Sequence, residues 1–501
     1  MVYLVGAGPG DPGLLTLRGA ELIGAAEVLV YDALVNADLL RLAPPSAEII
    51  YAGKRSRDHA IPQEELNALL VAKAKEGKRV VRLKGGDPYV FGRGGEEAAE
   101  LASQGVPFEV VPGITSAVAA PAYAGIPITH RDHCSSFTVL TGHEDPEKES
   151  SSIDFAQLAR FAGTKVVLMG VERLAHITSE LISHGMSPQT PVGLVRWGTT
   201  GRQQSITGTL SDIAERVRAA GFKAPAVTVI GEVVSLRSSL NWFEARPLFH
   251  RRIVVTRTRR QASALSRQLQ ELGAEVLEIP TIRIESPDHK TGVVDAIIGL
   301  NSYNWVVFTS PNGVDAFFEY FFKTFDDMRD IGGVKIAAVG PGTAAKLRNL
   351  HLEVDAMPDR ALTRELPAAM SAVESLENVS VLLARAQEAN PELPKALTAL
   401  GAIVDDVPFY KTVQETEDVQ GSAARFLEEG ADWITFTSSS TVEHFHARFG
   451  LPAVVERFPD LRLASIGPET TKALQAMGLK PHVEAREHTI VGLVQALLKW
   501  E

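Results

Sequence analysis

Short apolar runs alternate with longer amphipathic stretches over the first 245 residues of this chain. The runs are rich in Val, Leu and Ile and most end at a glycine or a polar residue, which is typical of strands in largely parallel sheets. The stretches between them have the pattern of covering helices, so the sequence predicts an α/β fold. The predicted strands are VYLVG (2–6), EVLVYD (27–32), RVVRLKGG (79–86), FEVVPG (108–113), KVVLMG (165–170), PVGLVRWG (191–198) and AVTVIGEV (226–233).

The chain from about residue 250 onward contains an internal repeat. Three motifs recur in the same order at an almost constant offset, which chance does not explain. Each copy is predicted to be a strand–helix–strand unit followed by two strand–turn–helix units, so this half is a duplicated α/β lobe. The pairs are 251–280 with 379–408, WVVFTSPNGVDAFF (305–318) with WITFTSSSTVEHFH (433–446), and IAAVGPGTAAKL (336–347) with LASIGPETTKAL (463–474).

Two prolines mark where the duplicated half crosses between its lobes. Pro280 and Pro408 lie in the extended, β-rich segments EVLEIPTIRIE and VDDVPFYKTV. Because proline disfavours the centre of a sheet, we expect edge or connecting strands there. The chain would then cross between lobes at these segments, with a small-molecule cleft between the lobes.

Composition narrows the classes of function. The chain has 501 residues, enough for about three domains, and a net charge of −11, which gives no reason to expect nucleic acid as a partner. Cys134 is the only cysteine, so no intrachain disulfide can form and no metal site is predicted. We find neither a signal peptide pattern nor an apolar stretch long enough for a membrane span, and expect a cytoplasmic protein.

Whether the first turn binds a phosphate depends on Asp11. The loop GAGPGD (6–11) has a GxGxG spacing, with Asp11 where a dinucleotide fingerprint requires a third glycine. A carboxylate there repels a pyrophosphate, and Pro9 and Pro12 remove two amide donors. A nicotinamide-dependent dehydrogenase is therefore disfavoured, and a nucleoside without phosphate is favoured. A tight strand-to-helix turn with no ligand is the alternative.

Further motifs give the first half a specific resemblance. RLKGGDPYVFGRGGEEA (82–98), VVPGITSAVAAPAYAGIPITHR (110–131), TGHED (141–145) and WGTTGRQQ (197–204) accompany the opening loop. With them, residues 1–245 closely resemble the uroporphyrinogen-III C-methyltransferases of the tetrapyrrole methylase group. The resemblance implies two α/β lobes that hold S-adenosyl-L-methionine between them and release S-adenosyl-L-homocysteine. It also implies a homodimer formed through this half.

The resemblance also assigns site residues. It implies that Asp32 is a proton acceptor and Lys54 a proton donor, although a turn or helix N-cap is the alternative for Asp32. Leu168 and Trp197 depart from the residues common in the family, which puts the pocket shape in doubt. The implied cofactor residues are Pro9, Gly85, Gly86, Asp87, Val90, Thr115, Ser116, Met169 and Gly198, and the implied receptors of substrate carboxylates, which could equally be solvated surface charges, are Arg55, Lys84, Arg93 and Arg131.

Residues 250–501 resemble the uroporphyrinogen-III synthases. This resemblance implies two α/β lobes joined by a two-stranded connector, one lobe from about 250–284 plus 413–501 and the other from about 287–408. It implies that Tyr410 helps a hydroxyl group to leave, but an edge-strand aromatic is equally consistent with that position. Strand-end hydroxyls would bind substrate, unless they are helix N-caps: Ser310, Thr343, Ser438 and Thr471.

Together the halves predict a bifunctional enzyme that acts on small tetrapyrroles. It would cyclise hydroxymethylbilane to uroporphyrinogen III with inversion of ring D, then methylate the ring twice with S-adenosyl-L-methionine to give precorrin-2. The alternative is a methyltransferase whose C-terminal half only binds substrate. The sequence leaves open whether the product continues to sirohaem, cobalamin or another tetrapyrrole.

Overall fold

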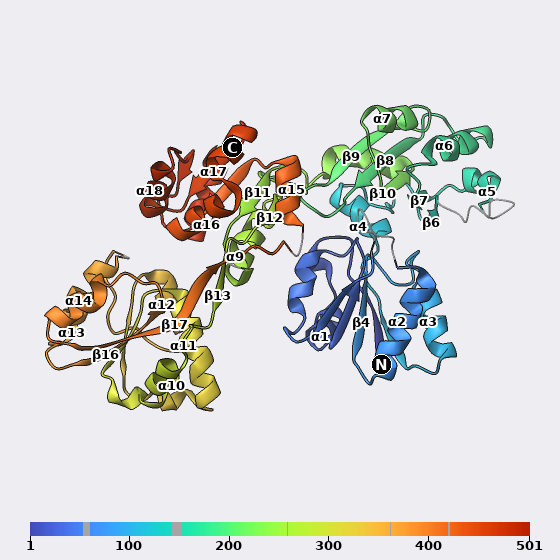
Figure 1. The fold of residues 1–501 in the computed structure, drawn as a ribbon. Helices are drawn as coiled ribbons and strands as arrows, with labels where there is room; N and C mark the ends of the chain where they lie inside the picture. Colours follow the sequence, from blue (N-terminus) through green and yellow to red (C-terminus); the bar gives the residue numbers. More distant parts are fainter. Residues whose placement is uncertain (54–60, 143–152, 258, 361, 419–420, 501) are drawn as a thin grey trace.

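The computed structural model describes residues 1–53, 61–142, 153–257, 259–360, 362–418 and 421–500. In these residues the strands form four five-stranded sheets, two in each half of the chain (Figure 1). Helices pack against the sheets, so the predicted α/β fold class is confirmed. No helix among the described residues is long and apolar enough to cross a lipid bilayer.

The first sheet is wholly parallel, with the strand order β3-β2-β4-β1-β5. Every residue of its central strand β4 is buried, because apolar clusters cover both faces of the sheet. The strands are β1 (Val2–Gly6), β2 (Val28–Tyr31), β3 (Glu48–Tyr51), β4 (Val80–Lys84) and β5 (Phe108–Val111), with helices η1 (Pro12–Leu14), α1 (Leu17–Gly24), η2 (Ala37–Leu42), α2 (Gln63–Lys75) and α3 (Gly94–Ser103).

The second sheet, ordered β6-β7-β10-β8-β9, corrects the prediction of largely parallel sheets. Only β6 and β7 run parallel, whereas β10 is antiparallel to both neighbours and β8 and β9 form a hairpin, whose short turn forces that direction. The elements are α4 (Ser116–Tyr123), β6 (Phe137–Thr141), α5 (Phe155–Arg160), β7 (Thr164–Leu168), α6 (Leu174–Ser183), β8 (Pro191–Arg196), β9 (Gln204–Thr209), α7 (Ile213–Ala219), β10 (Ala226–Ile230), η3 (Glu232–Leu236) and α8 (Arg237–Leu240).

The second half begins and ends in the same sheet, ordered β12-β11-β18-β19-β20 and wholly parallel. Trp433 and Phe436, both fully buried in β18, anchor the apolar clusters on its two faces. The elements are β11 (Arg252–Val255), α9 (Arg259–Glu271), β12 (Glu275–Glu278), α15 (Ser422–Glu429), β18 (Trp433–Phe436), α16 (Ser439–Phe449), α17 (Leu451–Arg457), β19 (Arg462–Ser465), α18 (Pro468–Ala476), β20 (Val483–Glu484) and α19 (Ile490–Trp500).

The residues between these two segments form the last sheet, ordered β13-β17-β16-β14-β15. Its aromatic core gathers Phe308, Phe317, Phe321 and Phe409, all fully buried. The elements are β13 (Ile282–Glu285), α10 (Thr291–Ile298), η4 (Leu300–Ser302), β14 (Trp305–Phe308), α11 (Pro311–Thr324), η5 (Met328–Ile331), β15 (Lys335–Ala338), α12 (Pro341–Arg348), η6 (Thr363–Glu365), α13 (Leu366–Val373), β16 (Ser380–Ala386), α14 (Glu392–Ala399) and β17 (Ile403–Gln414).

The long strand β17 connects the two lobes of the second half. Around Pro408 it pairs with β16, and its last four residues pair with β13 instead. Pro280 lies between β12 and β13, so both prolines lie in edge or connecting segments, as predicted. Arg448 of α16 donates hydrogen bonds to the carbonyls of Pro280 (3.3 Å) and Glu415 (2.9 Å), which fixes the two crossing segments against one helix.

Candidate functional site

Three turns at the carboxyl edge of the first sheet touch through their backbones. Gly8 and Gly86 exchange two hydrogen bonds, of 3.1 and 2.7 Å, between the turns after β1 and β4. A side-chain Cβ at Gly113, after β5, would lie 2.3 Å from the carbonyl oxygen of Gly86. Only glycine allows this approach, which brings the three glycine-rich motifs of the sequence into one site.

Asp87 holds two of these turns together. Its Oδ1 accepts hydrogen bonds from the amides of Tyr89 (2.8 Å) and Val90 (3.1 Å), and its Oδ2 accepts one from the amide of Gly113 (3.0 Å). The carboxylate therefore shapes the walls of the site, whereas the resemblance assigned the residue to the cofactor itself. Both roles are compatible if a ligand meets the backbone of this turn.

Asp11, the residue that argued against a phosphate, ties the first lobe to the second. Its Oδ1 accepts a hydrogen bond from the amide of Gly13 (2.8 Å), and its Oδ2 accepts one from the hydroxyl of Tyr123 (2.8 Å) in α4. Its own amide donates to Thr199 Oγ1 (3.0 Å) in the turn after β8. Burial and the adjacent carboxylate raise the pKa of Tyr123, so its phenol stays a donor.

The second lobe contributes two strained turns. Trp197 and Thr199 have positive φ angles of 48° and 71°, and Met169 has 54°. Left-handed backbone is rare for a β-branched residue such as Thr199, and such strain collects at functional sites. A Cβ at Gly198 would lie 2.5 Å from that of Ala120 in α4, so this turn packs directly on the helix that begins at Thr115 and Ser116.

The residues at these turns fit S-adenosyl-L-methionine. Large apolar side chains are exposed there, which is unusual unless a ligand covers them. An ideal Cβ at Gly86 meets nothing nearer than 3.9 Å, so the backbone beside Thr115 and Ser116 is open to a ligand. The thioether of Met169 and open glycine backbones suit an adenosine and its amino-acid tail. The exposed apolar residues are Tyr89, Val90, Phe91, Ile114 and Met169.

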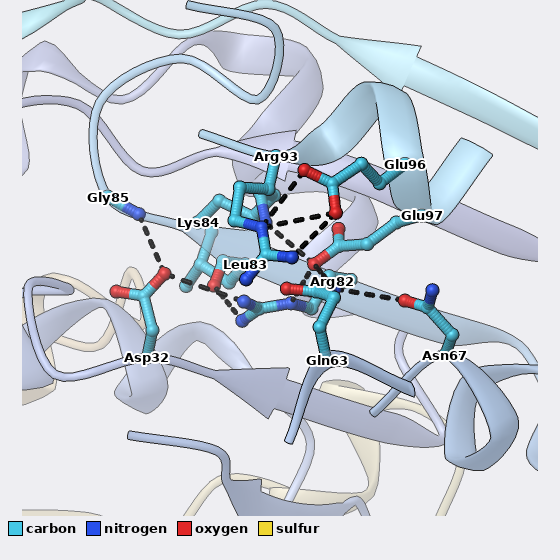
Figure 2. Close-up of polar contacts among 10 residues, drawn as sticks. All are labelled: Asp32, Gln63, Asn67, Arg82, Leu83, Lys84, Gly85, Arg93, Glu96 and Glu97. Carbon is cyan, nitrogen blue, oxygen red and sulfur yellow. Dashed lines mark hydrogen bonds and ion pairs between the residues drawn. The ribbon is translucent and has the colours of Figure 1, made fainter. Parts of the chain in front are cut away.

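Asp32 follows β2 at the same edge of the sheet (Figure 2). Its Oδ1 accepts a hydrogen bond from the amide of Leu34 (3.0 Å) and its Oδ2 from the amide of Gly85 (3.3 Å). The side chain is 27% exposed, so the carboxylate is held in place and still reaches solvent. Asp32 therefore stabilises a turn by accepting the hydrogen bond from Leu34, which was the alternative for this residue. Its partly exposed carboxylate is also accessible for proton transfer.

A buried charge cluster lies behind Asp32 (Figure 2). The fully buried Glu97 of α3 accepts hydrogen bonds through Oε1 from Lys84 Nζ (2.7 Å) and Arg82 Nε (3.3 Å) of β4. Arg82 Nη2 also lies 3.6 Å from Asp32 Oδ2, which links the cluster to the exposed carboxylate. Glu97 Oε2 is buried without a hydrogen-bond partner among the residues that the structure describes.

The placement of Lys84 corrects the prediction that it receives a substrate carboxylate. Its side chain is 4% exposed and paired with Glu97, so its charge is already neutralised inside the lobe. Burial, followed by the positive charge of Arg82, lowers the pKa of Lys84. Neither Arg82 nor Glu97 was predicted; the only signal was two basic residues inside an otherwise apolar strand.

The other predicted receptors are less constrained. Arg93 is exposed and pairs with Glu96 (2.7 Å), while Arg131 is exposed in the turn between the bridged residues His130 and Cys134. Lys54 and Arg55 lie outside the described residues. Pro9, an implied cofactor residue, lies in the loop after β1. It stands between Gly8, which bonds Gly86, and Asp11, which bonds Tyr123 and Thr199.

In the second half, Tyr410 and Ser310 meet. The Tyr410 hydroxyl lies 2.9 Å from Ser310 Oγ, which also caps α11 by accepting a hydrogen bond from the amide of Gly313. Tyr410 is 6% exposed, and burial raises the pKa of its phenol. It is aligned with Ala386 of β16, at the end of the segment that pairs with that strand.

The remaining hydroxyls are engaged within the protein. Thr343 is a correction: it is 2% exposed and donates to the carbonyl of Val339 (3.1 Å), which leaves it no access to a ligand. Ser438 caps α16 in a capping box with Thr441, the alternative that the sequence had left open. Thr471 donates to Ser465 Oγ (3.0 Å) and also to Glu484.

Comparison with known proteins finds one family model in each half of the chain. The family model "Tetrapyrrole (Corrin/Porphyrin) Methylases" matches residues 1–214, and "Uroporphyrinogen-III synthase HemD" matches residues 263–495. The chain is 39% identical over 500 residues to "Porphyrin biosynthesis protein HemD" of Ruminiclostridium josui, covering 99% of this chain and 97% of that protein.

Two further similarities concern the first half. Over 239 residues the chain is 56% identical to an S-adenosyl-L-methionine-dependent uroporphyrinogen III methyltransferase of Methanosarcina barkeri, covering 48% of this chain and 94% of that protein. A solved structure of uroporphyrin-III C-methyltransferase from Thermus thermophilus, complexed with S-adenyl homocysteine, is 42% identical. It covers 47% of this chain and 99% of its own, with a TM-score of 0.41.

The buried cluster predicts a large difference between two neighbouring glutamates. Glu97→Gln is expected to lower the free energy of unfolding of the first half by about 3 kcal/mol, because two buried cations would lose the charge between them. Glu96→Gln is the matched control, since its carboxylate pairs with an exposed arginine, and it should change that free energy by less than about 0.5 kcal/mol. Urea unfolding followed by circular dichroism measures both, and equal losses would contradict the buried pairing.

Proposed function

This chain belongs to the tetrapyrrole methylases through its first half and to the uroporphyrinogen-III synthases through its second, and on that premise we propose that it carries out two consecutive steps. The second half cyclises hydroxymethylbilane to uroporphyrinogen III with inversion of ring D. The first half then methylates this product twice to precorrin-2, with S-adenosyl-L-methionine as cofactor. The product serves a pathway to sirohaem or cobalamin in the cytoplasm, and the protein pairs as a homodimer through its first half.

One observation carries the methyltransferase assignment. Asp32 is bonded to the amide of Gly85, so the candidate base is held by the same turn that offers open backbone and exposed apolar side chains to the cofactor. Bound S-adenosyl-L-methionine supplies an electrophilic methyl group. The task of the protein is then to hold the attacking carbon in line with that methyl group, which the rigid glycine contacts support.

Asp32 completes each methylation by accepting a proton. The attacked ring carbon already carries a side chain, so methyl transfer makes it quaternary and leaves a cationic ring system that must lose a proton from another position of the macrocycle. A partly exposed carboxylate beside the cleft is suited to take that proton. Arg82, whose Nη2 lies 3.6 Å from Asp32 Oδ2, restrains the orientation of that carboxylate. Lys54, the proposed proton donor, belongs to the segment outside the described residues.

The synthase step rests on Tyr410. Loss of the hydroxyl group from hydroxymethylbilane leaves a cation that the substrate itself stabilises, so the protein mainly needs to fold the chain and donate a hydrogen bond to the departing oxygen. Because burial raises the pKa of Tyr410, the phenol keeps its proton at neutral pH. Ser310, 2.9 Å away at the start of α11, orients that hydroxyl.

A single incubation tests the proposal. The protein is supplied with hydroxymethylbilane and methyl-labelled S-adenosyl-L-methionine, and the macrocycle is identified by chromatography and mass spectrometry. We expect a type III ring with two labels. A label that is incorporated only when uroporphyrinogen III is added would instead favour a second half that merely binds substrate, and absence of any label would refute the methyltransferase.

Asp32→Asn tests the base. The amide retains one oxygen, which can still accept the 3.0 Å hydrogen bond from the amide of Leu34, but it does not take up a proton, so turnover should fall by about 100-fold or more. Binding of S-adenosyl-L-homocysteine, measured by calorimetry, should stay unchanged. Glu48→Gln, which removes an exposed carboxylate paired with Lys73, is the control and should keep full turnover. Undiminished turnover in Asp32→Asn would remove Asp32 from the mechanism.

Tyr410→Phe tests the synthase. We expect the rate of uroporphyrinogen III formation to fall by about tenfold or more, because the hydrogen bond to the leaving oxygen is lost. Tyr303→Phe is the matched control, since this tyrosine of the same lobe bonds the exposed Asp405. A Tyr410→Phe protein with the wild-type rate of cyclisation would show that the phenol does not act in this step.

A further inference from the structure

One strand of the second half touches the first half at both of its ends. Strand β12 lies at the edge of its sheet and, among the strands that the structure describes, pairs with β11 alone. At its start, a Cβ built on Gly201 would lie 2.3 Å from the carbonyl oxygen of Ala274 and from the amide nitrogen of Glu275. At its other end, the buried Glu278 forms an ion pair with Arg41. Figure 1 shows β12 and α15 on the side of the second half that faces β9.

The contact at Gly201 leads directly to the cofactor loops. Gly201 belongs to the turn between β8 and β9, which also contains Gly198 and the strained Thr199. Thr199 Oγ1 accepts the hydrogen bond from the amide of Asp11 in the first loop. This turn therefore contacts both the opening loop, through Thr199, and β12, through Gly201.

The residue after Gly201, Arg202, lies among charges of the second half at this end of the contact. The Arg202 guanidinium lies 3.5 Å from the centre of the Trp197 ring. Burial, followed by the charge of Arg425 in α15, lowers the pKa of Arg202 to about 10, an effect that Glu429 opposes. Arg425 and Arg252 both pair with Glu275, the first residue of β12. Charges of the second half thus surround the turn that holds Gly198.

The contact at Glu278 leads to the first loop by a second route. Arg41 lies in η2, which begins after Asn36, and the Asn36 side-chain amide donates to the carbonyl of Gly10 (2.7 Å). The same segment of chain starts at Asp32, the proposed base. Glu278 is therefore linked to the opening loop through one short helix, independently of the turn at Gly201.

Among the residues that the structure describes, the two halves share no apolar cluster at these contacts. The apolar clusters of the described residues lie either between residues 2 and 234 or between residues 248 and 497, and none spans both halves. The described contacts of the first half with β12 are the ion pair of Glu278 with Arg41 and the backbone approach of Gly201 to Ala274 and Glu275. Such a polar contact between complete domains adjusts their relative position more than it stabilises them.

We infer that β12 is a positioning element for the methyltransferase cleft: by holding the Gly201 turn and Arg41 together, the second half sets the affinity of the first half for its cofactor. This inference rests on the proposed methyltransferase function. Because coupling is reciprocal, bound cofactor must also strengthen the contact between the halves.

Calorimetric titration of the full chain with S-adenosyl-L-homocysteine tests the inference. Glu278→Gln removes the charge opposite Arg41, and we expect the dissociation constant of the variant for S-adenosyl-L-homocysteine to rise by about fivefold. The exchanged pair Arg41→Glu with Glu278→Arg restores the attraction and should recover most of the wild-type affinity. Glu374→Gln is the control, because its pair with Lys335 lies in the other lobe of the second half, and it should bind like the wild type.

Gly201→Ala provides a second, independent variant. The nearest atoms to the added methyl group all belong to Ala274 and Glu275, and Gly201 does not need a positive φ, so the substitution disturbs only the contact with β12. It should weaken binding in the same direction, with unchanged circular dichroism. Wild-type affinity in both Glu278→Gln and Gly201→Ala would overturn the inference. A wild-type protein that binds no S-adenosyl-L-homocysteine would instead refute the proposed methyltransferase.

Discussion

The first half depends on the close approach of backbones at the carboxyl edge of its parallel sheet. Gly6, Gly86 and Gly113 lie so near one another that a single methyl group on Gly113 would come within 2.3 Å of the Gly86 carbonyl oxygen. This approach places the turn after β4 where Asp87 can bridge it to Gly113 and where the Gly85 amide can bond Asp32. Without this approach the cofactor loops and the candidate base would not be held in fixed positions relative to one another.

Behind this frame, buried charges orient the base. Arg82 and Lys84 are balanced by Glu97 and Asp32, so two cations face two carboxylates across one strand and one helix. A buried ion pair is poor evidence for stability, since desolvation offsets most of the attraction. The pairing matters here because it fixes positions. The fully buried Glu97 holds Arg82 in place, and Arg82 faces Asp32, the member of this cluster whose carboxylate reaches solvent.

The sequence was sufficient for strands β1, β2, β4 and β5 of the first sheet, for the duplicated half and for the crossing near Pro280 and Pro408, because each has a local pattern; the short edge strand β3 (Glu48–Tyr51) was missed. It was misleading where distant parts decide the outcome. Lys84 looked like an anion receptor because its partner Glu97 is on another element, and the hydroxyl of Thr343 gave no sign that its own helix would bury it. The antiparallel second sheet was missed because runs of apolar residues carry no strand direction. Asp11 was singled out for its charge, and its hydrogen bonds with Tyr123 and Thr199 could not be predicted because they join residues more than a hundred positions apart.

Joining two consecutive enzymes in one chain already keeps the second supplied with the product of the first, because a tether raises the local concentration whatever the orientation of the halves. The contact at β12 does something that a tether alone does not. A flexible linker would leave the Gly201 turn and Arg41 free of the second half, whereas here both lie against one strand of it. Because this contact is polar and no apolar cluster of the described residues spans it, it can change when a ligand binds while the packing of either core stays the same. The arrangement therefore joins the two sites through the position of the cofactor loops as well as through shared substrate.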